Sequence, residues 1–216
     1  VPLWICLAPI WVLPDYFLLF EASGVRRLVA VSSTSRFTKS ASSDAAERAT
    51  VQRLIDGERC LQEWAESRGI EWVILRPTLI YGLGRDRNVS AVARFVRRFG
   101  FFPVLGAAAG LRQPLHADDL AAACTAALVS PAARNRAYNL SGGETLGYRE
   151  MVRRICAACG RRPRTPTIPL WLFRLAVAIL RHGLRRRQIS AGMAERMNVD
   201  LVFDHSAASA DLAFAP

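Results

Sequence analysis

The fold is decided by two apolar segments, Arg27–Thr34 (RLVAVSST) and Glu71–Pro77 (EWVILRP), and by the pattern between them. The first five residues of each segment are mainly β-branched or apolar, which is typical of parallel strands covered on both faces. Ala45–Arg68 carries apolar residues at helical spacing and is followed by Gly69. A helix between two such strands forms a βαβ unit. The pattern therefore predicts an α/β fold with a Rossmann-like, doubly wound parallel sheet.

The sequence on both sides of this unit continues the alternation of strands and helices. Upstream, we expect a strand in Trp4–Ala8 and a helix in Asp15–Ser23. The elements expected downstream are a helix over Val89–Phe99, a helix over Asp118–Leu128 with Asp118 as its N-cap, a strand over Ala137–Leu140 and a helix with its N-cap near Thr145.

The charge of the chain is concentrated in one stretch. The 216 residues are 51% hydrophobic, which excludes a disordered chain, and the net charge is +11. Arg149–Arg187 holds 11 arginines and one acid, a local charge of +10, so the rest of the chain carries only +1. The arginines lack interleaved aromatic residues on a recognisable module, so we expect no nucleic-acid partner. The apolar segment inside this stretch fits either an interfacial helix or a packed helix with a solvated basic rim.

The N-terminal segment and the cysteines bear on the cellular compartment of the protein. Val1–Phe20 is apolar, but its prolines and Asp15 fit neither a signal peptide nor a spanning helix. Five cysteines, an odd number, indicate reduced thiols in a cytoplasmic protein. The pair Cys156 and Cys159 lacks the second pair that a zinc ribbon needs, and the histidines are scattered, so no metal site is expected. The basic residues of the segment 161–187 are compatible with peripheral contact between this segment and the inner face of the membrane.

Four segments occur in an order that resembles a known family. They are RLVAVSST, ILRPTLIYGLG, GLRQPLHADDLAAAC and AYNLSGGETLGYREMVRRI. Together they are similar to the extended and atypical short-chain dehydrogenase/reductases, the NAD-dependent epimerase/dehydratase family. The resemblance implies an NAD or NADP cofactor and a small-molecule substrate such as a nucleotide sugar. It also implies an oxidoreductase that forms a homodimer through the helix Ala45–Arg68 and its predecessor.

The resemblance also implies roles for individual residues. The hydroxyl groups of Thr34 and Ser33 would hydrogen-bond the reacting oxygen of the substrate, because they follow a strand at the edge where ligands bind in such sheets. Arg112 lies in the pattern GLRQPLHADDL, where an arginine contacts the diphosphate of the substrate. The implied cofactor-binding residues are Ala8, Pro9, Ser32, Arg76, Pro77 and Thr78. The implied substrate-binding residues are Tyr81, Asn88 and Arg112.

Two departures from the family pattern affect the function. No glycine-rich G-x-x-G-x-x-G turn for the dinucleotide pyrophosphate is present, and the chain begins where the fourth strand of the family is expected. We therefore expect a truncated sheet, with residues 1–100 forming half of a cofactor domain and residues 101–216 a smaller α/β substrate lobe. The catalytic Tyr-x-x-x-Lys pair is also absent. Aligning Glu58 with the family pattern places Thr50 and Leu54 at these positions.

Two hypotheses remain open at this point. The first is an epimerase/dehydratase-like oxidoreductase, impaired because Thr50 and Leu54 cannot move a proton at neutral pH. The second is a non-catalytic binding or assembly protein that retains the fold. The absent pair favours the second hypothesis, whereas the retained Thr34 and Arg112 favour the first.

Overall fold

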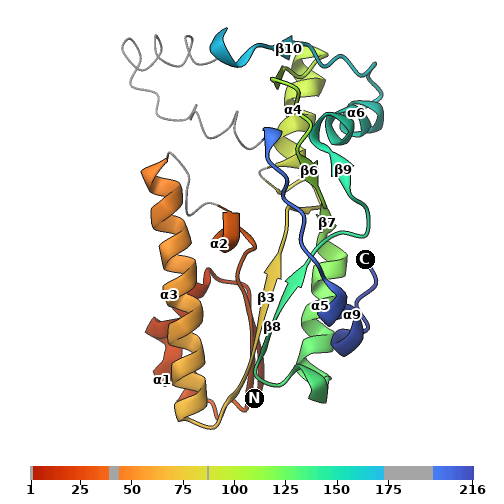
Figure 1. Ribbon diagram of the computed structural model, residues 1–216. Helices are drawn as coiled ribbons and strands as arrows, with labels where there is room; N and C mark the ends of the chain where they lie inside the picture. Colours follow the sequence, from red (N-terminus) through yellow and green to blue (C-terminus); the bar gives the residue numbers. More distant parts are fainter. Residues whose placement is uncertain (1, 39–43, 87, 173–196) are drawn as a thin grey trace.

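The centre of the protein is a four-stranded parallel sheet. The computed structural model describes residues 2–38, 44–86, 88–172 and 197–216. The strands are β1 (Leu3–Cys6), β2 (Arg27–Val31), β3 (Glu71–Pro77) and β8 (Arg136–Leu140), hydrogen-bonded in the order β1-β2-β3-β8 (Figure 1). Because every pair is parallel, all four carboxyl ends lie at one edge of the sheet. This edge is where ligands bind in open α/β sheets.

One face of the sheet packs against helices from the first third of the chain. These are η1 (Ile10–Tyr16), a 3₁₀ helix, α1 (Phe17–Ala22) and α3 (Ala45–Ser67). Leu28 and Ala30 of β2 share a hydrophobic cluster with Leu54 and Leu61 of α3. Gly57 allows α3 to approach η1 closely, because a Cβ there would lie 2.9 Å from the backbone nitrogen of Trp11. The helix α3 therefore stands directly beside the strand ends.

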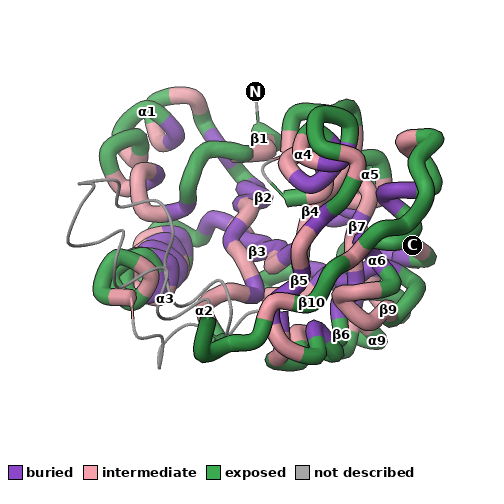
Figure 2. The backbone as a smooth tube through the Cα atoms, turned by 90° about the horizontal axis from the view of Figure 1, so that it is seen from above, coloured by how far each residue is buried: buried purple, intermediate pink, exposed green. Residues whose placement is uncertain are grey.

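The opposite face packs against α5 (Ala117–Val129) and α9 (Ser206–Leu212). Val29 of β2 and Val73 of β3, which alternate with the residues of the first face, join Cys124 of α5 in a second cluster. Figure 2 shows the buried backbone as a band through the strands and the inner side of α3. Alternate strand residues thus bury both faces, as predicted for a doubly wound sheet.

The third hydrophobic cluster forms a separate lobe beyond the carboxyl ends of the strands. The helices α4 (Val89–Phe99) and α6 (Tyr148–Ala158) pack through Val96 and Val152 (Figure 1). Three two-stranded ladders complete it: β4 (Ile80–Tyr81) with β7 (Leu115–His116), β5 (Val104–Leu105) with β10 (Thr167–Ile168), and β6 (Leu111–Arg112) with β9 (Leu146–Gly147). The short helices α2 (Ser35–Thr38) and η2 (Pro131–Ala133) lie in connections. The division between residues 100 and 101 stays a prediction.

The predicted elements are present, but several bounds differ. The strand predicted at Trp4–Ala8 spans Leu3–Cys6, and the helix predicted at Asp15–Ser23 begins as a 3₁₀ helix at Ile10 and ends as α1 at Ala22. The strand at Arg27–Val31 and the helix at Val89–Phe99 have the predicted bounds. Asp118 is not the N-cap of α5, because the imidazole of His116 accepts the Asp118 N–H. The helix α6 begins at Tyr148 rather than near Thr145, because the preceding backbone pairs with β6.

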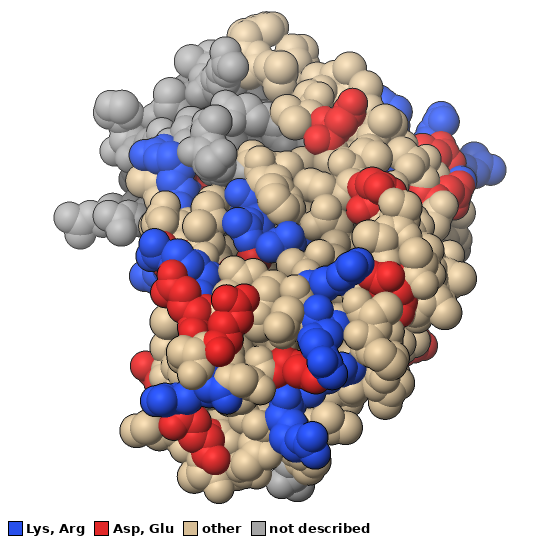
Figure 3. Space-filling view, turned by 60° about the horizontal axis from the view of Figure 1, so that its bottom comes forward, with Lys and Arg blue, Asp and Glu red and all other residues tan. Residues whose placement is uncertain are grey.

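The surface at the amino ends of the strands carries both signs of charge. Figure 3 shows both basic and acidic side chains among the residues described on this face. Most of the arginine-rich segment Arg161–Arg187 lies outside the described residues, so the expected membrane contact is not tested by its structure. Within the described residues, no helix is long and apolar enough to cross a membrane.

Candidate functional site

A hollow lies at the carboxyl edge of the sheet, between the ends of β1 and β2 and the start of α3. Its volume is about 270 Å³. Its lining residues are Leu7, Ala8, Pro9, Ile10, Trp11, Val31, Ser32, Ser33, Ser35, Thr50, Val51 and Leu54. The structure thus brings together four predicted residues, Ala8, Pro9, Ser32 and Ser33. It also places the two positions of the missing catalytic pair on the wall of the same hollow.

The two predicted catalytic hydroxyl groups differ in availability. Thr34 is buried, and its Oγ1 donates to the carbonyl oxygen of Pro77 at 3.1 Å. Ser33 is half-buried and lines the hollow, and its Oγ accepts the backbone N–H of Ser35 at 3.1 Å. An accepting hydroxyl keeps its proton for another partner. In this arrangement Ser33 can donate to a ligand, whereas Thr34 must first release Pro77.

The carboxylate of Glu58 is the electrostatic centre of this edge. Only 1% of the Glu58 side chain is exposed, and it accepts Ser32 Oγ at 2.5 Å. It forms ion pairs with Arg36 and with Arg76, whose Nη2 lies 2.6 Å from Glu58 Oε2. Burial lowers the pKa of the Arg36 guanidinium, helped by the nearby charge of Arg76, and burial alone lowers the pKa of Arg76. Both groups remain cations at neutral pH, because an arginine begins from so high a pKa.

Neither residue at the missing catalytic positions has a side chain that gains or loses a proton near neutral pH. The Thr50 hydroxyl donates to the carbonyl oxygen of Ala46 at 2.8 Å within α3. Leu54, one helical turn further, is 5% exposed. Lys39, the single lysine of the chain, lies outside the described residues. The hollow therefore contains hydroxyl donors but, among its described lining residues, no ionisable side chain.

The other predicted cofactor-binding residues lie at the end of β3. Arg76 is held by Glu58, and Thr78 Oγ1 donates to the carbonyl oxygen of Gln113 at 2.6 Å. Pro77 contributes the carbonyl that accepts Thr34. Backbone and hydroxyl groups around an apolar hollow suit the nicotinamide end of a dinucleotide, which Ala8 and Pro9 would hold. The residues that are present therefore fit this part of the cofactor.

The structure does not bring the predicted substrate-binding residues into one cavity. Tyr81 lines a second hollow of about 440 Å³ between α4, α6 and the loop that follows β4, and its ring meets His116 edge-on. Asn88 is exposed at the N-cap position of α4 without a side-chain cap bond. Arg112 is only 3% exposed, and its Nη1 donates to the carbonyl oxygens of Leu111 and Val199. Their roles in binding a substrate stay predictions.

None of the cysteines lines the hollow at the carboxyl edge, and Cys159 lines the second hollow. All five are free, and burial raises the pKa of Cys156, helped by the nearby Cys159. Among the described residues, no group of three histidine, cysteine or acidic side chains could hold a metal ion.

Sequence reasoning missed Arg36 and the role of Glu58. A signal for Glu58 exists in the sequence, because it lies four residues after Leu54 and three before Leu61 on the face predicted to be buried. An acid on a buried helix face needs a cationic partner. Arg36 carries no such signal, since it lies in a polar connection.

Comparisons with known proteins agree with this geometry. The model of the NAD dependent epimerase/dehydratase family matches residues 18–141, more than half of the chain. The uncharacterized protein y4nG of Sinorhizobium fredii is 28% identical over 202 residues, 90% of this chain and 50% of that protein. The alpha subcomplex subunit 9 of the mitochondrial NADH dehydrogenase from Arabidopsis thaliana is 25% identical over 150 residues, which cover 69% of this chain and 35% of the subunit.

A solved structure shows the same fold. The UDP-glucose 4-epimerase of Thermotoga maritima, crystallised with UDP-glucose, matches with a TM-score of 0.67 at 15% identity, covering 93% of this chain and 61% of the epimerase. This chain spans about half the length of y4nG and a smaller share of the plant subunit. The parallel sheet of this chain agrees with the family match. The chain belongs to the NAD dependent epimerase/dehydratase family.

Proposed function

We propose that this chain forms part of an NAD(P)-dependent, epimerase/dehydratase-like oxidoreductase that acts on a nucleotide sugar or a similar small molecule. The observation that carries the proposal is the hollow at the carboxyl edge, where Ser33 meets Ala8 and Pro9. Donors at this edge face the crevice in which parallel sheets bind ligands. The similar fold of the Thermotoga maritima UDP-glucose 4-epimerase, which was crystallised with UDP-glucose, supports the substrate class.

The hydroxyl groups would act on the reacting oxygen of the substrate. A bound dinucleotide would supply hydride transfer. Ser33 would donate a hydrogen bond to the substrate oxygen and orient it, with Thr34 as a second donor. Arg112, Tyr81 and Asn88 are proposed to bind the remainder of the substrate, after Arg112 turns away from the carbonyl oxygens that it now contacts.

The missing proton carrier sets the expected rate. A positioned general acid or base contributes about 10²–10⁴-fold to a rate. Thr50 and Leu54 supply neither, so turnover is expected to be slow and to depend on a proton carrier from solvent. A Thr50→Tyr, Leu54→Lys double variant would restore both groups on the same face of α3.

The test uses the whole protein. NAD⁺ and NADP⁺ are titrated by calorimetry, and reduction of the bound dinucleotide by UDP-glucose is followed at 340 nm. We expect micromolar dinucleotide binding, slow reduction, and faster reduction in the double variant. Binding without reduction in either form would exclude the oxidoreductase. Absence of dinucleotide binding would exclude the cofactor as well.

A second candidate is a non-catalytic subunit or assembly protein. The specific observation in its favour is that Thr50 is bonded into its own helix and Leu54 is buried. The Arabidopsis thaliana relative of this chain is a subunit of the mitochondrial NADH dehydrogenase. Dinucleotide binding without turnover, together with co-purification in a defined complex, would select this candidate.

Two finer expectations also remain proposals, a homodimer and membrane contact. The helix α1 exposes Leu18 and Leu19, an apolar surface beside α3 that suits a second copy. Trp171 is 68% exposed near Arg161 and Arg162 in the sequence, which suits an anionic leaflet. A monomer in sedimentation experiments would contradict the first. If the protein does not float with anionic vesicles in a salt-sensitive manner, the membrane contact is contradicted.

A further inference from the structure

The charges of the carboxyl-edge cluster do not balance. Two guanidinium groups share the single carboxylate of Glu58, so Arg36, Glu58 and Arg76 together carry one positive charge. The side chains are 21%, 1% and 16% exposed, respectively. A mostly buried net charge is costly unless another group compensates it.

The remaining donors of this cluster point to what could compensate the charge. The carboxylate of Glu58 accepts hydrogen bonds from Nη1 of Arg36 and from both Nε and Nη2 of Arg76. Among the described residues, Glu58 is the one hydrogen-bond acceptor of both guanidinium groups, and each guanidinium has five N–H donors. The ring of Phe37 lies 5.3 Å from Cζ of Arg36 and 5.5 Å from Cζ of Arg76, and this ring is 48% exposed.

The cluster lies where a substrate would extend from the hollow. The backbone N–H of Arg36 donates to the carbonyl oxygen of Ser33, so the two residues are one turn apart. Neither arginine lines the hollow itself. Arg76 belongs to β3, the neighbour of β2, which ends two residues before Ser33, and Figure 1 shows α2 beyond the strand ends, between α3 and β3. A ligand held by Ser33 and reaching toward β3 would therefore meet Arg36.

We infer that Arg36, supported by Glu58 and Arg76, binds a carboxylate of the substrate and thereby selects an acidic sugar-like ligand over its neutral counterpart. The planar fork of a guanidinium matches the two oxygens of a carboxylate. Glu58 would fix the orientation of both guanidinium groups, and the ligand would supply the second negative charge. Glu58 and Arg76 are positioning residues in this account, and Arg36 makes the contact.

This inference rests on the proposed function in that the ligand is taken to lie over Ser33. The test compares UDP-glucuronate with UDP-glucose, which differ only in a carboxylate against a hydroxymethyl group. Affinities are measured by calorimetry on the whole protein with NAD⁺ present. We expect UDP-glucuronate to bind at least about tenfold more tightly, which corresponds to one charge-assisted contact.

Three variants separate recognition from a structural role. Arg36→Gln should remove the preference, so that UDP-glucuronate and UDP-glucose bind this variant with affinities within about twofold of each other. Arg36→Lys should keep part of the preference, because the charge remains and the fork is lost. Arg53→Gln, which changes an exposed arginine on α3, is the matched control and should keep the whole preference. Equal affinities in the wild-type protein, or an unchanged preference in Arg36→Gln, would overturn the inference.

A second measurement covers the case in which neither nucleotide sugar binds, which would contradict the proposed substrate class. Acetate is then titrated into ¹⁵N-labelled protein, and the Nε–Hε resonances of the arginines are followed. We expect a saturable change in the chemical shift of the Arg36 resonance, in the wild-type protein and in the Arg53→Gln variant alike. If the Arg36 resonance does not respond, the carboxylate site is wrong independently of the substrate class.

Discussion

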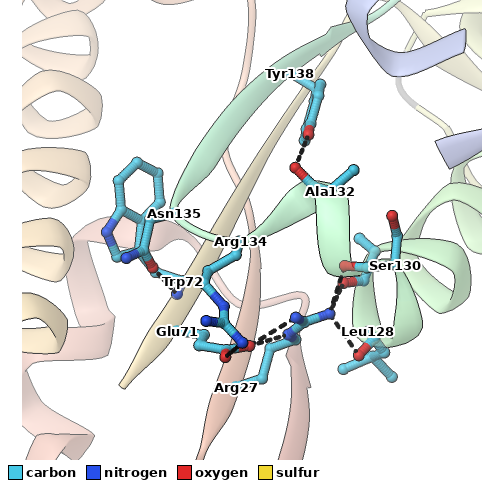
Figure 4. A network of polar contacts seen from close by, with 10 residues as sticks. Arg27, Glu71, Trp72, Leu128, Ser130, Ala132, Arg134, Asn135 and Tyr138 are labelled. Carbon is cyan, nitrogen blue, oxygen red and sulfur yellow. Dashed lines mark hydrogen bonds and ion pairs between the residues drawn. The ribbon is translucent and has the colours of Figure 1, made fainter. Parts of the chain in front are cut away.

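The sheet carries a cluster of two arginines and one glutamate at each end, and the two clusters differ in what surrounds them. At the amino end, Glu71 pairs with Arg27 at 2.6 Å and with Arg134 at 2.6 Å (Figure 4). At the carboxyl end, Glu58 pairs with Arg36 and Arg76. The composition is the same, but Glu71 is 26% exposed and Glu58 is 1% exposed.

The excess positive charge has a different environment in each cluster. Arg27 Nη1 donates to the carbonyl oxygens of Ala127, Leu128 and Ser130 at the end of α5 (Figure 4). The carbonyls of Ala127 and Leu128 lie in the last turn of α5 and carry the negative end of the helix dipole, so they stabilise the cation. Arg134 is 63% exposed and is solvated. The amino-end cluster is thus complete in itself, whereas the carboxyl-end cluster has donors left for a ligand.

The largest expected effect comes from Glu58→Gln. Removing this carboxylate leaves two partly buried guanidinium groups without a counter-ion, and breaking such a pair costs about 3–5 kcal/mol. Urea unfolding should show the loss as a lower midpoint. Glu63→Gln, an exposed acid on the same helix, should change stability by less than about 0.5 kcal/mol. Equal midpoints for the two variants would show that the carboxyl-end cluster carries no buried charge.

Arg27→Met should have a smaller effect and should separate the two clusters. It removes the ion pair with Glu71 and the contacts with α5, which together are worth about 1–3 kcal/mol, because Glu71 is partly exposed and keeps Arg134 as a partner. Ligand affinity should not change, because the cluster lies at the opposite edge of the sheet. Arg26→Met, an exposed neighbour, is the matched control for stability. A loss of ligand affinity in Arg27→Met would contradict the separation of the two ends.

The smallest effect concerns alkaline pH and Tyr138, the middle residue of β8. Its hydroxyl donates to Asp211 Oδ2 at 2.7 Å, and burial, followed by this bond, raises its pKa well above the ordinary value. A raised pKa stabilises the folded protein below the pKa of the unfolded tyrosine, about 10, and this contribution is lost as the pH rises further. The free energy of unfolding should therefore fall less steeply above pH 10 in Tyr138→Phe. Identical slopes for the two proteins would contradict the assignment.

The strands and helices around the site were predictable from local pattern. The strand Arg27–Val31 and the helix α3 have strong periodicities, and the helix Val89–Phe99 has its predicted bounds. The start of α5 was predicted wrongly because Asp118 and His116 both resemble a cap, and only the tertiary structure decides which side chain accepts the N–H. Helix starts are weakly determined by sequence when two capping residues are adjacent.

The site was predictable only where it follows a strand. Ser33 lies at the carboxyl edge because a parallel strand ends before it, so its position followed from the pattern. The partners of Glu58 did not, because Arg36 and Arg76 are 22 and 18 residues away in sequence and meet it through the packing of α3 on the sheet. The hydrogen bond of the Arg112 side chain could not be predicted from the sequence pattern either, since the carbonyl that accepts it belongs to Val199, 87 residues away.

The most direct test of the difference between the two ends is a crystal structure of the whole protein with NAD⁺ and UDP-glucuronate. The account predicts that the sugar lies over Ser33, with its carboxylate within hydrogen-bonding distance of Arg36 and with Arg27 still bonded to the end of α5. A sugar bound elsewhere, or one bound over Ser33 with its carboxylate turned away from Arg36, would contradict it.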